Sequence, residues 1–484
     1  MSFRQNRQPR ARAEDENNHC GGDEVANTLY DLLQGVADMQ PRGSGKENQE
    51  VKHVVIVGGG FAGLNCARKL ASRSDVHITL IDKNNYQQFQ PLLYQVATAE
   101  LSATNAAFSL RSVLREHPNV DVKLGEAVSV DLKSRTVTIA EGQTYQGDFL
   151  VLAAGSQANF FGTPGANQHA YPLYSIHDAE LLRSRILAVI EAADRDPSVL
   201  AKGALNFVIV GAGPTGTEMA GALGSVIHAG AEKFGDRLAS QAHVFLVDRG
   251  HAVLSAFSEK AQAYAAKILQ ERNVTLRLGT GVNEIGDGYV VLDDGSKILT
   301  HTVIWAGGLK ASALSNCTGI QCGHGGRLDV QPDLTVKGFE GVYALGDFAN
   351  ITGKDGKPLP QLGSVAEQSG KWCAKNIASD LANEARKPFQ YLDKGIMAMI
   401  GRNAAVAEVG EHRHELQGTV AFAAWVGVHA ALLTTTRAKI GAFIEWAWDY
   451  FGHMHSDLIL DRPDQAKINW NEDEPTEMVQ SSKG

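Results

Sequence analysis

The hydrophobic residues of this chain fall into short β-branched runs, and segments with the periodicity of a helix stand between them. Runs of this kind are typical of buried parallel strands, whereas apolar residues three or four positions apart indicate helices. The runs are Val54–Val57, Val76–Ile81, Phe149–Leu152, Phe207–Val210, His243–Val247, Val303–Trp305 and Val342–Leu345. The helical segments include Leu64–Ala71, 178–203 and Thr217–Leu223. Strands that alternate with helices predict an α/β fold built on parallel sheets.

A glycine pattern follows the first run directly. In HVVIVGGGFAG, the residues Gly58, Gly60 and Gly63 match G-x-G-x-x-G. Its glycines allow a tight turn, a close approach to a pyrophosphate, and close packing of helix on strand. The phosphates of such a site lie at the N-terminus of the following helix. Asp82 ends the next run nineteen residues after Gly63, where a carboxylate can accept a hydrogen bond from a ribose hydroxyl. The sequence therefore predicts a dinucleotide site here.

The same arrangement recurs in the second half of the chain. Another run leads into a second G-x-G-x-x-G, formed by Gly211, Gly213 and Gly216. Asp248 ends the run after it, farther along the chain than the usual span of about twenty residues. Segment 225–241 is therefore expected to hold an extra helix or loop. Two fingerprints, each followed by an acid, predict two dinucleotide folds.

The second acid bears on the choice of nucleotide. A carboxylate at Asp248 accepts a hydrogen bond from a ribose 2′-hydroxyl and repels a 2′-phosphate, which favours NADH over NADPH. Arg249 follows it directly, and a cation at this place weakens that preference.

Turns of small residues close three of the runs. FLVLAAG ends at Gly155, VIWAGG ends at Gly308, and TVKGFEGVYALGD ends at Asp347. The last of these resembles the pattern that closes FAD domains in flavoproteins with two dinucleotide folds, where the aspartate bonds the ribityl chain. By that resemblance the first site holds FAD.

Composition narrows the class of function. The formal net charge of −9 argues against nucleic acid as a partner. Five scattered cysteines indicate a reducing compartment, and no histidine or cysteine cluster has the spacing of a metal site, so we expect no metal. Because no apolar core follows the first methionine, we expect no secretory signal. Residues 1–50 are polar and predict a largely disordered arm, inside which 23–39 has the spacing of a short helix.

Taken together, these motifs resemble the type II NADH dehydrogenases, single-chain flavoproteins that pass electrons from NADH to a membrane quinone. The resemblance covers roughly Lys52 to Arg462. It includes GGGFAG, FQPLLYQVAT (Phe89–Thr98), VLAAG, GAGPTGTEMAG (Gly211–Gly221), WAGG, VYALGD and FQYLDKGIMAMIGRNAAVA (Phe389–Ala407). It implies a non-proton-pumping NADH:quinone oxidoreductase with non-covalent FAD, and a homodimer is consistent with it.

The resemblance also assigns residues. Gln90, Pro91 and Leu92 would lie beside the flavin, and Glu218 near the nicotinamide and the point of hydride transfer. The expected cofactor-binding residues are Gly58, Gly60, Phe61, Ala62, Gly63, Asp82, Lys83, Gln90, Pro91, Leu92, Ala154, Gly155, Gly346 and Asp347 for FAD, and Gly211, Gly213, Pro214, Thr215, Gly216, Asp248, Ala306 and Gly307 for NADH. For Glu218, an acid stabilised by a helix N-terminus is an equally good account.

One motif departs from the family. Its members carry two glutamines in the helix after the Gly-Asp turn, and both line the quinone entrance. In LPQLGSVAEQSG the second is kept as Gln368, but Ser364 replaces the first. A serine has a shorter reach and different hydrogen-bonding capacity from an amide. We expect Ser364 and Gln368 at the quinone site. Gln361, three residues before Ser364, is only a weak candidate to replace the lost amide.

Two apolar segments stand near the C-terminus. TVAFAAWVGVHAALL (Thr419–Leu433) and IGAFIEWAWDYF (Ile440–Phe451) are separated by Arg437 and Lys439. The first is shorter than the roughly twenty residues that a membrane-spanning helix needs. Aromatic and basic residues beside apolar helices suit a protein that lies in one leaflet of a membrane, although two buried helices of a domain or dimer contact are the alternative.

These inferences give a fold of two nested Rossmann-like dinucleotide-binding domains, the FAD domain interrupted by the NADH domain, plus a C-terminal membrane-associating helical region. The expected order is a polar arm (1–50), the N-terminal segment of the FAD domain (51–175), the NADH domain (176–319), the C-terminal segment of the FAD domain (320–395), a membrane-anchoring region (396–462) and a polar, disordered tail (463–484). The protein would lie on the cytoplasmic face of a bacterial inner membrane. Two alternatives stay open: a soluble NADH-dependent flavoprotein reductase with a non-quinone acceptor, which Ser364 favours, and a redox-sensing flavoprotein.

Overall fold

The computed structural model describes residues 50–234, 236–452, 458–460, 463–466, 468 and 470. The chain divides into two units, Met1–Glu50 and Val51–Gly484, and the second carries every feature described below. The arm expected for residues 1–50 and the short helix expected for 23–39 therefore fall outside the described residues, Glu50 excepted.

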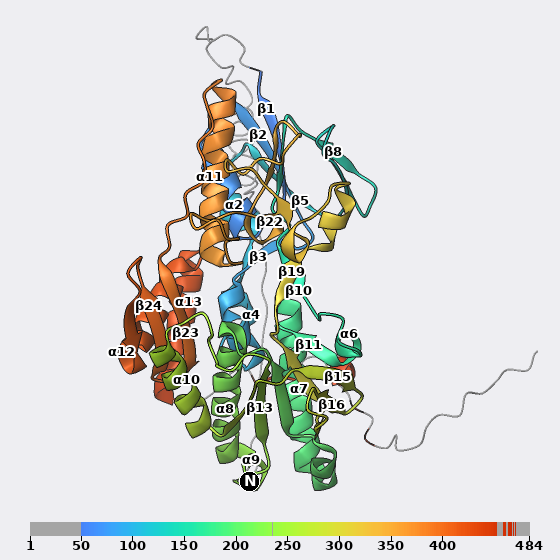
Figure 1. The fold of residues 1–484 in the computed structure, drawn as a ribbon, viewed down its shortest axis with the longest axis vertical. Helices are drawn as coiled ribbons and strands as arrows, with labels where there is room; N and C mark the ends of the chain where they lie inside the picture. The colour runs from blue at the N-terminus through green and yellow to red at the C-terminus, as the bar shows by residue number, and fades with distance from the viewer. Residues whose placement is uncertain are drawn as a thin grey trace, which may run out of the picture. The chain divides into compact units, whose positions relative to one another are not determined.

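A five-stranded parallel sheet takes its strands from distant parts of the chain (Figure 1). In spatial order they are β21 (Val342–Ala344), β9 (Phe149–Leu152), β1 (Lys52–Val57), β2 (Val76–Asp82) and β5 (Val120–Leu124). Two long helices pack together beside it, α2 (Phe61–Leu70) and α11 (Gly363–Leu381). They approach so closely that a Cβ added to Gly370 would lie 2.1 Å from the Ala62 carbonyl oxygen. Because β21 and α11 follow the second fold in the chain, the first fold is interrupted, as expected.

A second five-stranded parallel sheet carries the second fingerprint. Its order is β11 (Ala170–Pro172), β18 (Thr302–Trp305), β12 (Asn206–Val210), β13 (His243–Asp248) and β14 (Val274–Leu278). β11 joins this sheet from before residue 176, where we placed the start of the NADH domain. The core of this half continues into the C-terminal helices, because residues of both lie in one cluster of buried side chains.

Helices around the second sheet occupy the expected segments. A capping box at Ser175 begins α7 (Ile176–Arg195), and the 3₁₀ helix η2 (Pro197–Lys202) follows it. Between the second fingerprint and Asp248 lie α8 (Pro214–Phe234) and α9 (Asp236–Ala239). These two helices account for the long separation seen in the sequence. The remaining helices of this half are α6 (Ala166–His169) and α10 (Glu259–Glu271).

Short antiparallel elements complete the two halves. The pair β10 (Ser156–Ala158) and β19 (Leu309–Ala311) joins the two exits of small residues. The other small sheets are β6 (Ala127–Asp131), β7 (Thr136–Ile139) and β8 (Thr144–Gln146); β15 (Val282–Gly286), β16 (Tyr289–Leu292) and β17 (Lys297–Leu299); β3 (Tyr86–Gln88) with β4 (Ala107–Ser109); and the parallel pair β20 (Leu328–Asp329) with β22 (Ala349–Asn350). The remaining short helices are η1 (Gln90–Leu92), α3 (Leu93–Ala97), α4 (Ala103–Ala106), α5 (Leu110–Leu114), η3 (Ala313–Cys317), η4 (His324–Gly326) and η5 (Gly346–Phe348).

The C-terminal region forms a three-stranded antiparallel sheet and two helices. The sheet is β23 (Gly395–Gly401), β24 (Ala404–Val409) and β25 (His414–Gln417), and the helices are α12 (Gly418–Leu432) and α13 (Thr436–Gly452). In Figure 1 this region stands beside α8 and α10, and β23 packs on α8. Trp425 on α12 is fully buried in the shared core.

Among the described residues, no helix has the length and the apolar character that crossing a membrane requires. The polar tail needs a correction, because we expected disorder from residue 463 onward. Instead, α14 (Pro463–Ala466) packs against α7, and the ring of Trp470 lies 4.6 Å from that of His301. The prediction failed because it considered only the polar composition of the tail, whereas Ile468 and Trp470 pack against the core.

Candidate dinucleotide sites and a cavity at Glu218

The first glycine turn has the geometry of a phosphate cradle. Gly58 adopts φ +102°, and a Cβ there would lie 2.2 Å from the Ala153 carbonyl oxygen. A Cβ on Gly63 would lie 1.8 Å from the carbonyl oxygen of Gly58, whereas one on Gly60 would meet no atom within 4 Å. Helix α2 starts with no capping side chain and no acid in its first turn. Its first amides, which include those of Phe61 and Ala62, are thus available to an anion.

Asp82 supports this turn from the end of β2. Its Oδ2 accepts a hydrogen bond from the Gly59 amide at 2.6 Å, and its Oδ1 accepts one from the Asn84 amide at 2.7 Å. Burial raises the pKa of Asp82, and the two amides partly offset that rise. The carboxylate therefore fixes the shape of the turn. Its role toward a ribose stays a prediction, for which each oxygen keeps a further lone pair.

Asp347 lies in a buried cluster at the end of β21. Its Oδ2 is 3.0 Å from the Ser156 hydroxyl, which in turn is 2.8 Å from the Tyr174 hydroxyl. Burial raises the pKa of Tyr174 to about 12 and raises that of Asp347. Arg327, also buried, has its pKa lowered by burial, and its charge favours an ionised Asp347. Sequence reasoning missed Ser156, which directly follows the VLAAG motif, and also Tyr174 and Arg327, which belong to segments without a motif.

Gln90 offers an independent test for a bound ring system. It begins η1 with Pro91 and Leu92, and its Oε1 is buried without a hydrogen-bond partner. Since a buried acceptor left unpaired costs about 1–3 kcal/mol, a ligand N–H is expected there. A flavin carries one such N–H, so this orphaned oxygen and the open cradle at Gly60 fit FAD.

The second glycine turn repeats the first. Gly211 adopts φ +103°, and a Cβ on Gly216 would lie 1.8 Å from its carbonyl oxygen, whereas one on Gly213 would meet nothing within 4 Å. The exit after β18 abuts this turn, since a Cβ on Gly211 would lie 2.4 Å from the Ala306 carbonyl oxygen and 2.8 Å from the Cα of Gly307. The predicted residues of the second site therefore lie together around the N-terminus of α8, which starts at Pro214 and Thr215.

Asp248 has the same place in the second turn as Asp82 in the first. Its Oδ2 accepts a hydrogen bond from the Ala212 amide at 2.7 Å, and its Oδ1 accepts one from the Gly250 amide at 2.6 Å. Both carboxylates thus fasten a glycine turn, a function that the spacing alone did not reveal.

Glu218, one turn into α8, is buried and accepts a hydrogen bond from the Met399 amide at 3.2 Å. Burial raises its pKa to about 8, against smaller opposing effects of Met399 and Trp425. The carboxyl group is therefore mostly protonated at neutral pH. Because Oε1 accepts from Met399, we expect the proton on Oε2.

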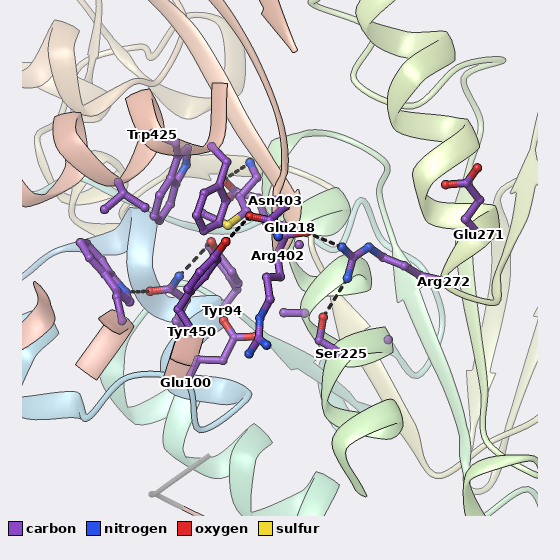
Figure 2. A pocket seen from close by; sticks show the side chains of 18 of the residues that line it. Tyr94, Glu100, Glu218, Ser225, Glu271, Arg272, Arg402, Asn403, Trp425 and Tyr450 are labelled. Atoms are coloured by element: carbon purple, nitrogen blue, oxygen red, sulfur yellow. Dashed lines mark hydrogen bonds between the residues drawn. The ribbon is translucent and has the colours of Figure 1, made fainter. Parts of the chain in front are cut away.

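A cavity of about 470 Å³ surrounds Glu218 (Figure 2). Its aromatic wall comes from Tyr94, Phe422, Trp425, Trp446 and Tyr450, and its polar wall from Ser225, Glu271, Arg272, Asn273, Arg402 and Asn403. In the view of Figure 2, Trp425 and Tyr450 lie on one side of Glu218, and Arg272 with Ser225 on the other. The cavity thus joins an apolar face, supplied largely by α12 and α13, to a polar end.

Trp425 is the unusual residue of this wall. It is fully buried, yet its indole Nε1 makes no hydrogen bond of ordinary geometry. By contrast, Nε1 of Trp446 donates to Gln95 Oε1 at 2.9 Å. The ring of His429 stacks on Trp425 at 3.9 Å, and burial lowers the pKa of His429 to about 4, so a neutral imidazole supports the indole. A cavity with one orphaned donor and one protonated carboxyl suits a ligand with hydrogen-bond acceptors.

The two remaining predicted catalytic residues lie elsewhere on α11. The Ser364 hydroxyl is 2.9 Å from that of Tyr391. The Gln368 amide donates to the carbonyl oxygen of Leu392 and accepts from its N–H, each at 3.0 Å. Neither residue belongs to the lining of the cavity. Gln361 donates to the Asp347 carbonyl oxygen at 3.3 Å.

The described cysteines form no disulfides. Cys317 and Cys322 are free thiols beside η3, and Cys66 and Cys373 are buried free thiols on α2 and α11. Within the stretches of chain that the structure describes, no three His, Cys, Asp or Glu side chains gather as a metal site would require.

Comparison with known proteins gives a consistent picture. A family model described as pyridine nucleotide-disulphide oxidoreductase matches residues 52–370. A Mycobacterium tuberculosis type II NADH:quinone oxidoreductase, Ndh, is 38% identical over 84% of this chain and 90% of its own length. The Staphylococcus aureus type II NADH:quinone oxidoreductase is 30% identical over 75% of this chain and 90% of its own.

Among solved structures, NDH2 of Plasmodium falciparum in complex with NADH superposes with a TM-score of 0.76 at 19% identity. It covers 84% of this chain and 99% of that one. The sulfide:quinone oxidoreductase of Aquifex aeolicus superposes with a TM-score of 0.65 at 18% identity, covering 84% and 96% of the two chains. At these identities the likeness concerns the fold.

Proposed function

We infer the function from the family to which this chain belongs, the type II NADH:quinone oxidoreductases, within the pyridine nucleotide-disulphide oxidoreductases. The chain is an enzyme that transfers electrons from NADH to a quinone, with FAD as its cofactor. The observation that carries this conclusion is the 38% identity to a relative of that name over 90% of the relative's length. When bound, FAD supplies the redox chemistry by accepting two electrons from NADH and passing them to the quinone.

We propose that the first fold holds FAD and the second holds NADH. The open cradle at Gly60 and the amides of α2 would hold the FAD phosphates. Asp347 would bond the ribityl chain, and the orphaned Oε1 of Gln90 would accept from the flavin ring. Gly213 and the N-terminus of α8 would hold the NADH phosphates in the same way.

We propose that the quinone head group binds in the cavity at Glu218. The aromatic wall matches a flat apolar ring, and a quinone has two carbonyl acceptors for which Trp425 Nε1 and the protonated Glu218 are donors. Reduction of a quinone to a quinol consumes two protons. Glu218 holds a proton at Oε2 inside the cavity, and the polar end around Arg272 would give water access for its replacement.

Ser364 and Gln368 are proposed to act on the quinone cavity indirectly, through the segment that precedes β23. They hold Tyr391 and Leu392, in the connection that leads into β23. Met399 on that strand lines the cavity and bonds Glu218. In this proposal Ser364 still positions the segment before β23, because its short side chain reaches the hydroxyl of Tyr391.

Steady-state kinetics test the function directly. We expect purified holoenzyme to oxidise NADH rapidly with a short-chain ubiquinone or a menaquinone analogue, and NADPH slowly with either. Ferricyanide, which needs no quinone pocket, serves as the control acceptor. If NADH reduces the flavin and ferricyanide reoxidises it but neither quinone does, the enzyme is a reductase with another acceptor. A flavin that NADH does not reduce would overturn the proposal altogether.

The outer faces of α12 and α13 are proposed to lie on a membrane surface. Large apolar side chains are exposed on these faces: Val420, Val428, Leu432, Ile440, Phe443, Ile444 and Trp448. Arg437 and Lys439 stand between the two apolar segments. Such an apolar face beside basic residues suits an interface with anionic lipid. Because NADH is a cytoplasmic substrate, the proposed location is the cytoplasmic face of a bacterial inner membrane.

Replacement of two of these side chains should release the protein from lipid. Phe443→Ser with Ile444→Ser is expected to lower co-sedimentation with phosphatidylglycerol-containing vesicles at least tenfold, because each lost side chain removes about 1.5–3 kcal/mol of apolar burial. Leu299→Ser, which alters an exposed leucine on β17, is the matched control. If the wild-type protein does not co-sediment with vesicles, and if the wild type is a dimer but the double variant a monomer, the face is instead a contact between two copies.

A further inference from the structure

Arg249 stands at the place where a dinucleotide fold reads the adenosine ribose. It follows Asp248 at the carboxyl end of β13, the second strand of this fold. In such folds an acid here contacts the 2′-hydroxyl of NADH, and an arginine nearby accommodates the 2′-phosphate of NADPH. Both Asp248 oxygens already bond main-chain amides, whereas the Arg249 side chain is 71% exposed. The orientation of Arg249 therefore bears directly on the choice of nucleotide.

A second acid contacts the Arg249 side chain. Arg249 Nε lies 3.3 Å from Oδ2 of Asp293, and the same oxygen accepts a hydrogen bond from the Gly281 amide at 2.9 Å. A Cβ on Gly281 would lie 2.3 Å from Arg249 Nε and 2.7 Å from Asp293 Oδ2, so the arginine rests on the main chain of Gly281.

Asp293 itself is firmly placed. It follows β16 in the turn that leads to β17, and its N–H donates to the Gly281 carbonyl oxygen at 2.9 Å. Asp293 is thus anchored to Gly281, in the loop before β15, by its carboxylate and by its main-chain N–H, and the guanidinium of Arg249 adds a second contact to the carboxylate. An exposed ion pair contributes about 0–1 kcal/mol, so its removal would change a preference without unfolding the domain.

We propose that Asp293 is a specificity-determining residue, which selects NADH by holding Arg249 and adding negative charge beside the ribose site. This inference rests on the proposal that the second fold binds NADH. Asp293 holds the guanidinium of Arg249 away from the 2′-phosphate of NADPH, and the negative charge of Asp293 repels that phosphate. In the sequence, the cation at Arg249 weakens the predicted preference for NADH. In this proposal the contact with Asp293 restores that preference.

The test is the ratio of kcat/KM for NADPH and NADH, with ferricyanide as acceptor so that quinone binding plays no part. For Asp293→Asn, whose amide oxygen can still accept from Gly281, we expect kcat/KM for NADPH to rise about five- to tenfold, a gain of ~1–1.4 kcal/mol. The value for NADH should stay within twofold. Adding Arg249→Ala to this variant should remove the gain.

Asp294→Asn is the matched control. Asp294 is the next residue, carries the same charge, and bonds the amide and hydroxyl of Ser296 in its own turn. If Asp294→Asn raises NADPH use equally, general charge is responsible and the role of Asp293 is overturned, as it is if Asp293→Asn leaves the ratio unchanged. Wild-type flavin that NADH fails to reduce would instead overturn the proposed function. Melting temperature and flavin content confirm that each variant is folded.

Discussion

A Gly60→Ala protein is expected to fold normally and to purify almost without FAD. Gly60 has φ −74°, which alanine adopts freely, and its added Cβ would meet no protein atom within 4 Å. That open space is where the main chain would approach the FAD pyrophosphate, so a methyl group there would collide with the ligand alone. We expect FAD affinity to fall about a hundredfold or more, equivalent to ~3 kcal/mol. Absorbance near the flavin band and isothermal titration with FAD measure the loss.

Gly63→Ala is the contrasting variant. Its Cβ would lie 1.8 Å from the Gly58 carbonyl oxygen, a contact that no side-chain rotation relieves. Overpacking of this kind costs about 1–3 kcal/mol or more, so melting temperature and soluble yield should both fall. A Gly60→Ala protein that keeps its FAD would show that the phosphates lie elsewhere. If both variants lost stability equally, Gly60 would serve the fold and not the ligand.

These two glycines illustrate what the sequence could predict. Three local patterns were recognisable: the fingerprints, the acids after the second strands and the Gly-Asp turn. Each contains a position where the space admits only glycine or where the hydrogen bonds need a carboxylate. The interruption of the first fold followed from the order of these patterns, and the pairing of β21 with β9 confirms that order. Local chemistry at fixed spacing is therefore the predictable aspect of this protein.

Contacts between distant segments were not predictable. Tyr174 and Ser156 meet Asp347 because β10 and β21 emerge near each other, and the motif at Asp347 does not indicate these two partners. The Arg249–Asp293 pair joins two sheets in the same way. Family resemblance also directed attention to Ser364 and Gln368, yet the cavity at Glu218 takes its walls from α3, α8, α10, β23, α12 and α13. Only the fold shows that the indole Nε1 of Trp425 is buried near Glu218 without a hydrogen bond of ordinary geometry.

Glu218→Gln should separate reduction of the flavin from reduction of the quinone. Glutamine keeps the size of the side chain and an acceptor for the Met399 amide, but it has no acidic proton. General acid catalysis contributes about 10²–10⁴-fold, so we expect kcat with a ubiquinone analogue to fall about a hundredfold while NADH:ferricyanide turnover changes less than threefold. Trp425→Phe, which keeps an aromatic ring but removes the indole N–H together with part of the buried ring, should lower kcat/KM for the quinone about tenfold and leave the ferricyanide reaction intact.

The pH dependence gives the decisive measurement, because the pKa of Glu218 is raised to about 8. Wild-type quinone reduction should decline as pH rises through this value, whereas Glu218→Gln should show a low, flat profile over the same range. The folded state binds this proton more tightly than the unfolded state, so stability contributed at Glu218 is lost as pH rises from the ordinary carboxyl range toward 8. Glu218→Gln should therefore melt higher than wild type at pH 9, with a smaller difference at pH 5. Equal alkaline declines in both proteins would assign the titration to another group and remove Glu218 from the proton path.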